Sequence, residues 1–178
     1  KHLLIAIKQD PQDEQALQMM ADQLIVQREY IEAESIFKQL NKIDPTNIRY
    51  IIALGELLKI KKDFSGAMDL YLKAFSLEPS RYELLDTAGR FALQLNDYNK
   101  SKSIYKQLSE TAPNEERYLF IYIDLISKSK SYIEGIEHVE SLNKKYGETA
   151  VRNLQLGLLH YRSGDTDKGL LLIETSIN

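Results

Sequence analysis

Few residues of this sequence belong to the types that perform acid–base, nucleophilic or metal chemistry. The 178 residues include three histidines and no cysteine, so no disulfide, thiolate nucleophile or cysteine-based zinc site can form. His138 lies among Glu134, Glu137 and Glu140, a composition that could hold a metal ion. No second histidine follows at a helical spacing, and the zinc-protease pattern His-Glu-x-x-His is absent. We therefore expect a solvated helix face around His138.

Other catalytic signatures are missing as well. The sequence has no glycine-rich phosphate loop, no Gly-x-Ser-x-Gly motif and no evident pair of catalytic carboxylates. His160 occupies a repeat position that is otherwise apolar, so we expect a partly buried structural histidine there. These absences predict a chain that is not an enzyme and binds no cofactor or metal.

Composition and charge restrict the class of protein further. Lys and Arg total 23 and Asp and Glu total 26, giving a net charge of −3, while 43% of the residues are hydrophobic. This mix is typical of globular proteins, and the lack of basic excess argues against nucleic acid as a partner. No apolar run approaches the length of a membrane span. We expect a soluble chain, and the absence of cysteine leaves cytoplasm and periplasm both open.

The elements that must position any functional residue follow from an internal repeat of 34 residues. The four prolines are spaced by this period: Pro11, Pro45, Pro79 and Pro113. An aromatic column has the same spacing: Tyr30, Phe64, Tyr98 and Tyr132. So does a column of small residues: Ala33, Ala67, Ser101, Gly135 and Gly169. Such self-similarity is typical of repeat architectures.

Each period contains two apolar helical patterns separated by a polar turn. Ile51, Leu54 and Leu58 lie on one helix face, and a second face starts at Phe64 after the turn 61–63. The repeating unit is therefore a helix–turn–helix. We expect a single solenoid over residues 1–178, with eleven helices including partial ones. Residues 1–13 hold the second helix of a partial repeat, and the units that follow are 14–47, 48–81, 82–115, 116–149 and the partial 150–178.

The pattern resembles the tetratricopeptide repeat family. The matching residues of the second unit are Ile51-x-x-Leu54-Gly55-x-x-Leu58, Ala67-x-x-x-Tyr71, Ala74 and Pro79. The resemblance implies an all-α fold, a right-handed superhelical solenoid of antiparallel helix pairs, and we expect the chain to be a fragment of a longer array. The fourth unit departs from the pattern, because Ile123 replaces the small residue of the first helix, which puts close packing there in doubt.

The resemblance also implies where a partner would bind, in a concave groove lined by the first helix of each unit. The candidate groove residues are Arg49, Ile52, Glu56, Asp86, Arg90, Arg117, Phe120, Asp124, Leu154, Leu158 and Tyr161. Some family members hold a peptide carboxylate with Lys and Asn in this groove. Gln18, Asp22, Arg49 and Ala53 stand at the corresponding positions, so we do not expect that mode of binding.

Two features of the groove leave alternatives open. The first is an apolar cluster formed by Phe120, Ile121, Leu154, Leu158 and Tyr161. It could hold an extended segment or an amphipathic helix. Alternatively, it could pack against further units or a flanking domain, and we favour this second interpretation. The second is a recurring set of arginines, Arg49, Arg90, Arg117 and Arg162. They could bind an acidic peptide or a phosphate, but we expect pairing with groove carboxylates.

These features together predict a non-catalytic interaction scaffold that binds a protein or peptide partner in its groove. One alternative is a structural or regulatory segment that packs on other domains of the same polypeptide. Another is self-association into a homo-oligomer through the open ends of the solenoid.

Overall fold

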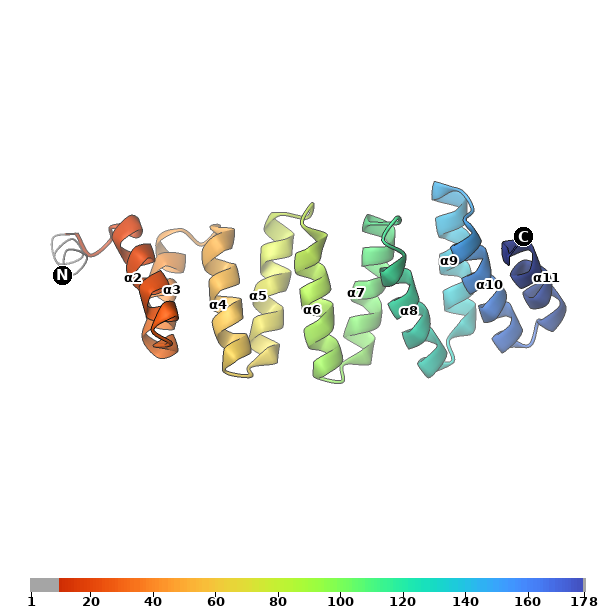
Figure 1. Cartoon of the computed structure of the whole chain (residues 1–178), viewed down its shortest axis with the longest axis horizontal. Helices are drawn as coiled ribbons and strands as arrows, with labels where there is room; N and C mark the ends of the chain where they lie inside the picture. Colours follow the sequence, from red (N-terminus) through yellow and green to blue (C-terminus); the bar gives the residue numbers. More distant parts are fainter. Residues whose placement is uncertain (1–9, 178) are drawn as a thin grey trace. The chain divides into compact units, whose positions relative to one another are not determined.

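The computed structural model of the protein describes residues 10–177, and all regular structure within this range is α-helical. The expected helix around Leu3 and Ala6 lies outside the described residues. The chain divides into two compact units, the first ending at Asn96 and the second beginning at Asp97. Each unit is a row of antiparallel helices in which successive helices lie side by side (Figure 1).

Within residues 10–177, each unit contains five helices. Those of the first are α2 (Glu14–Val26), α3 (Tyr30–Ile43), α4 (Ile48–Ile60), α5 (Phe64–Leu77) and α6 (Tyr82–Gln94). Those of the second are α7 (Tyr98–Thr111), α8 (Glu116–Ser129), α9 (Tyr132–Tyr146), α10 (Ala150–Ser163) and α11 (Thr166–Ile177).

Helix starts follow the 34-residue period, and capping residues stand at several of them. The aromatic column supplies the first residue of each of α3, α5, α7 and α9. Asp63 and Asp97 precede two of these helices and accept hydrogen bonds from the backbone N–H groups of Gly66 and Lys100, both at 2.9 Å. Such bonds satisfy donors that have no partner inside the helix.

The tight turn inside each repeat contains one residue in the left-handed region, again at a spacing of 34. These residues are Arg28, Lys62, Asn96, Lys130 and Gly164, with φ between 55° and 102°. Only the last is glycine, the residue that adopts this backbone without strain.

The core lies between the helices, where small residues leave room for aromatic rings. A Cβ atom added to Gly55 of α4 would lie 2.9 Å from the ring of Tyr71 on α5, and this ring in turn contacts Phe91 of α6 at a centroid distance of 5.8 Å. Ile123 of α8 is buried instead of a small residue, and α8 and α9 pack less closely than α4 and α5 or α10 and α11.

Candidate binding surface

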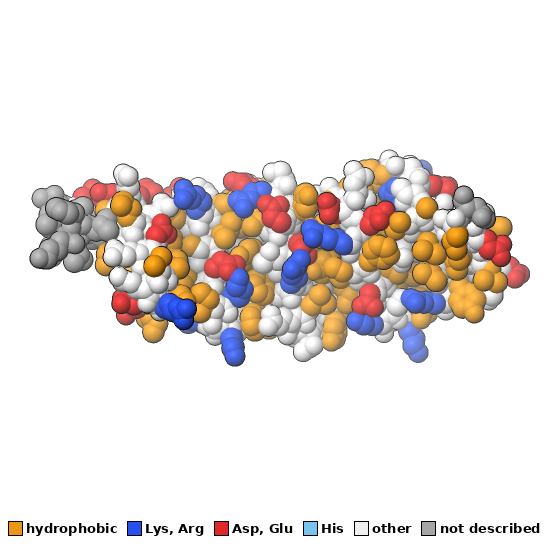
Figure 2. Space-filling model, viewed as in Figure 1, with side chains coloured by type: hydrophobic (Ala, Val, Ile, Leu, Met, Phe, Trp, Pro, Cys, Tyr) orange, Lys and Arg blue, Asp and Glu red, His pale blue; other side chains and the backbone are white. Residues whose placement is uncertain are grey.

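Helices α8 and α10 of the second unit carry an exposed apolar surface. It consists of Phe120, Ile121, Leu154, Leu158 and Tyr161, which we call the α8/α10 surface. Phe120 is 43% exposed and Tyr161 is 51% exposed, and the other three are half-buried. Figure 2 shows hydrophobic side chains gathered over this part of the second unit. By contrast, Tyr118 and Tyr122 on the opposite side of α8 are fully buried.

A hydrogen bond ties the two helices of this surface together. Arg162 Nη1 on α10 donates to Ser127 Oγ on α8 at 2.6 Å. Ser127 follows Phe120 by two helical turns, and Leu154 and Leu158 precede Arg162 by two turns and one turn, so these side chains lie on the adjoining faces of α8 and α10. The structure therefore brings Phe120, Leu154 and Leu158 onto one surface.

Charged groups surround this apolar surface. The Arg117 guanidinium lies 4.7 Å from the centre of the Tyr118 ring, donates to Tyr118 Oη at 2.8 Å and lies 3.5 Å from Glu115 Oε2. Asp124 pairs with Lys128 at 2.7 Å on the exposed side of α8. Both signs of charge therefore border the apolar residues.

The candidate residues of the first unit have a more polar setting. Arg49 is exposed and Ile52 is half-buried on α4. Glu56 accepts a hydrogen bond from Tyr71 and pairs with Lys59. Burial works against ionisation of Glu56, but these two partners outweigh it and lower the carboxyl pKa. On α6, Asp86 is buried and pairs with the exposed Arg90 at 2.9 Å.

The expected pairing of groove arginines with groove carboxylates is observed between Arg90 and Asp86. Glu56 and Asp124 pair instead with lysines one turn further along their own helices, because residues three or four apart share a helix face.

The prediction that His138 lies on a solvated helix face is wrong. Its side chain is 4% exposed, and its Nε2 atom lies 2.7 Å from Ser109 Oγ of α7. Burial, and second the charge of Lys106, lower the His138 pKa to about 4. The repeat column contained the missed signal, because Ile36, Leu70 and Ile104 are apolar at the preceding equivalent positions. His160 is buried, as expected.

Two absences can be stated for the part of the chain that the structure describes. Residues 10–177 contain no cluster of three or more His, Asp or Glu side chains arranged to hold a metal ion. No helix in that range is long and apolar enough to cross a bilayer.

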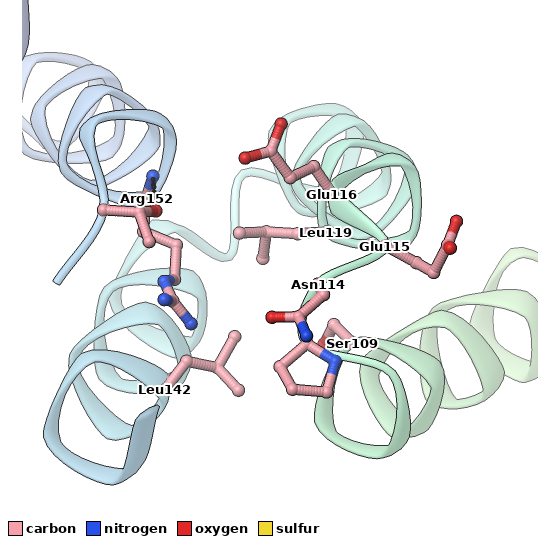
Figure 3. Close-up of a pocket in the computed structure, with 9 residues that line it drawn as sticks. Ser109, Asn114, Glu115, Glu116, Leu119, Leu142 and Arg152 are labelled. Atoms are coloured by element: carbon pink, nitrogen blue, oxygen red, sulfur yellow. Dashed lines mark hydrogen bonds between the residues drawn. The ribbon is translucent and has the colours of Figure 1, made fainter. Parts of the chain in front are cut away.

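The residue that sequence reasoning missed altogether is Arg152, near the start of α10. It is only 7% exposed and lines a cavity of about 130 Å³ within the second unit. Figure 3 shows its guanidinium group pointing into this cavity, with Leu142 of α9 and Asn114 of the α7–α8 loop beside it. The buried residues at the equivalent repeat positions are Ala16, Tyr50, Leu84 and Tyr118, so a charged residue in an apolar column was the available signal.

Comparison with known proteins identifies the repeat. Residues 82–115, which were expected to form the third repeat, match the family model described as tetratricopeptide repeat. Solved tetratricopeptide structures have the same fold along almost the whole chain, as detailed below. The chain has the fold of tetratricopeptide-repeat proteins. Its small-residue columns and helix pairs are thus the packing elements of that repeat.

Among curated proteins, the chain is similar to the chaperone protein SicA of Salmonella typhimurium and of Salmonella dublin. The identity is 27% over 110 residues, which cover 62% of this chain and 62% of each relative. The match thus spans less than two thirds of the length of these curated relatives.

Solved structures show the same fold at low identity. The crystal structure of YrrB, titled a tetratricopeptide-repeat protein with an unusual peptide-binding site, has a TM-score of 0.58 and 15% identity, covering 99% of this chain and 91% of YrrB. The structure of Naa15/Naa10 bound to HypK-THB has a TM-score of 0.72 and 18% identity, covering 97% of this chain and 28% of that one. PilF of Pseudomonas aeruginosa has a TM-score of 0.54 and 20% identity, covering 96% of this chain and 78% of the PilF chain.

Proposed function

We propose that this protein is a non-catalytic interaction module that binds a segment of a protein partner on the α8/α10 surface. The tetratricopeptide fold is typical of protein–protein interaction, and the chaperone relatives fit a binding role. The proposal needs no cofactor, since apolar contact and hydrogen bonding at the surface supply the recognition.

The observation that carries the proposal is the exposure of two aromatic rings on a helical framework. Phe120 and Tyr161 are about half exposed, although other aromatic residues of α8 are buried in the core. Aromatic side chains lose little conformational entropy on binding and are enriched among residues that dominate binding energy. Their position on packed helices fixes them before a partner arrives, which lowers the cost of association.

The chemistry of the surface defines the partner. Its centre is apolar, so the bound segment must present apolar or aromatic side chains there. Arg117, the Asp124–Lys128 pair and Arg162 border the centre, so polar groups of either sign on the segment find a counterpart at the edge. An amphipathic helix or an extended segment with alternating apolar residues meets both requirements.

The test is selection of peptides from a random displayed library on the immobilised protein, followed by affinity measurement with the selected peptides. The test variant is Phe120→Ala combined with Tyr161→Ala. We expect it to bind the selected peptides at least about tenfold more weakly, because truncated aromatic anchors commonly cost about 2 kcal/mol of binding free energy.

The matched control is Ile133→Ala combined with Ile31→Ala, which removes exposed apolar side chains from the second helices α9 and α3. Circular dichroism should show unchanged helix content in both double variants. Equal binding by the wild-type protein and the Phe120/Tyr161 variant would show that the partner segment binds elsewhere.

A further inference from the structure

The strongest unexplained feature outside the α8/α10 surface is the buried guanidinium of Arg152. Its Nε and Nη1 atoms are buried and have no hydrogen-bond partner within the described part of the chain. A buried charge without a partner is costly, and natural structures pair such groups or bind a counter-ion. The cavity beside Arg152 provides space for such a partner.

The walls of this cavity combine polar and apolar groups. Asn114 lies across from the guanidinium, and Ser109 lies at the end of α7 (Figure 3). Leu119 and Leu142 supply apolar walls. A water molecule occupies about 30 Å³ in the liquid, so a cavity of about 130 Å³ has room for a carboxylate and the carbon that carries it.

We propose that the Arg152 pocket binds a single carboxylate group, presented by an acidic side chain or by a chain terminus of a partner. The guanidinium N–H groups donate to the carboxylate oxygens, which gives short, charge-assisted hydrogen bonds. The Asn114 side-chain amide faces the same space and offers a further donor, while Leu119 and Leu142 contact the carbon chain behind the carboxylate. This site uses other residues than the α8/α10 surface and does not depend on it.

The charges around the pocket favour a monoanion over phosphate. Glu115 and Glu116 also line the cavity, and Figure 3 shows both carboxylates pointing away from the guanidinium. Two nearby negative charges repel a dianion more strongly than a single carboxylate. The apolar walls likewise fit a carbon chain better than a fully hydrated anion.

An internal partner for Arg152 is the competing explanation, and the repeat shows which residue it would be. In the first unit, Tyr50 stands at the position equivalent to Arg152, and its hydroxyl donates to Glu14 Oε2 at 3.1 Å. Glu116 stands at the position equivalent to Glu14. In the structure Glu116 points away from Arg152 (Figure 3), which leaves the guanidinium directed to the cavity.

The experiment is an NMR titration of the ¹⁵N-labelled protein, following the Arg152 Nε–H group and the backbone amides of Asn114 and Leu119. N-acetyl-glutamate α-amide presents a side-chain carboxylate and N-acetyl-alanine presents a terminal one. N-acetyl-glutamine α-amide is the neutral control, and inorganic phosphate tests the charge argument. We expect saturable shifts with one or both carboxylate probes and weaker binding of phosphate. The probe that binds shows whether the carboxylate comes from a side chain or from a chain terminus.

Four variants complete the test. Arg152→Lys should lower the affinity for the carboxylate probe about tenfold, which corresponds to about 1.4 kcal/mol of binding free energy. Arg152→Leu should abolish the saturable shifts. Arg81→Leu, which removes a partly exposed arginine of the first unit, should leave them unchanged. Glu116→Gln should tighten binding about threefold, because it removes a repelling charge.

The proposal is overturned if the neutral probe produces the same shifts, if phosphate binds more tightly than the carboxylates, or if binding persists in Arg152→Leu. It is also overturned if Glu116→Gln destabilises the fold and leaves probe affinity unchanged, since Glu116 would then be the partner of Arg152 in solution.

Discussion

Acidification should destabilise this protein through His138. Ser109 Oγ donates its only hydrogen to the carbonyl oxygen of Lys106 at 2.7 Å, so His138 Nε2–H donates to Ser109 Oγ at 2.7 Å. The Tyr122 ring covers the imidazole edge-on at 4.8 Å. The neutral imidazole therefore fits this hydrogen bond, and protonation would place a positive charge in the core beside Lys106. The carboxylates of Glu134 and of Glu110, whose Oε1 lies 3.5 Å from Nδ1, oppose the effects of burial and Lys106 but do not outweigh them.

The sign and the size of the effect follow from linkage. The His138 pKa is about 4 in the folded protein, against the ordinary histidine value of 6.5. The unfolded chain therefore binds the proton more tightly, and stability falls as the pH drops below about 6.5. A pKa difference of one corresponds to about 1.4 kcal/mol, so going from pH 7 to pH 4 should remove about 3 kcal/mol. The loss should level off below pH 4, where both states are protonated.

The assay is urea unfolding followed by circular dichroism from pH 7 to pH 4, for the wild-type protein and for His138→Gln. Glutamine keeps a donor near Ser109 and does not titrate. Carboxylates titrate in both proteins, so the difference between the two free energies of unfolding isolates His138. On acidification from pH 7 to pH 4, we expect the wild-type protein to lose about 3 kcal/mol more of its free energy of unfolding than His138→Gln does. A difference that stays constant with pH, or an imidazole titration by NMR near pH 6.5, would refute the reasoning.

Two further predictions concern helix packing and capping. Gly169→Ala should destabilise the fold by about 1–2 kcal/mol, measured by thermal unfolding. The new Cβ would lie 2.6 Å from the Tyr161 backbone nitrogen, and the cost of this overpacking outweighs the gain in helix propensity. Gly135→Ala should cost less, since its Cβ meets only side-chain atoms, and equal stability of the two variants would contradict the close crossing of α10 and α11. Asp63→Ala should cost about 1 kcal/mol by removing the cap of α5, whereas the exposed mid-helix change Asp69→Ala should stay within about 0.5 kcal/mol. Indistinguishable melting curves for these two aspartate variants would show that the cap contributes nothing.

The helices could be predicted from the sequence because their determinants are local and recur every 34 residues. Capping residues such as Asp97, and the small column that includes Ala67 and Gly169, act within one repeat or on the next helix. For the same reason, the family could be recognised from the residues of a single unit. The apolar character of Phe120 and Tyr161 was also visible, since repeat register alone places them on first helices.

The burial of His138 and Arg152 depended on more than the nearest residues. The glutamates around His138 indicated a solvated face, but its environment is set by Ser109 and Tyr122, on two other helices. Their repeat columns were apolar, so the signal was present in the register and absent from the local composition.

The sequence by itself determined an all-helical array of 34-residue repeats, because helix periodicity, caps and small residues are local properties repeated along the chain. The tertiary structure decided which exceptions to the repeat have consequences. At His138 the neighbouring helices close around the ring, so its pKa falls. At Arg152 they leave a cavity of about 130 Å³ beside the guanidinium. Whether a polar side chain in an apolar column is enclosed or faces open space depends on the shapes of residues far away in the sequence, which only the packed helices bring together.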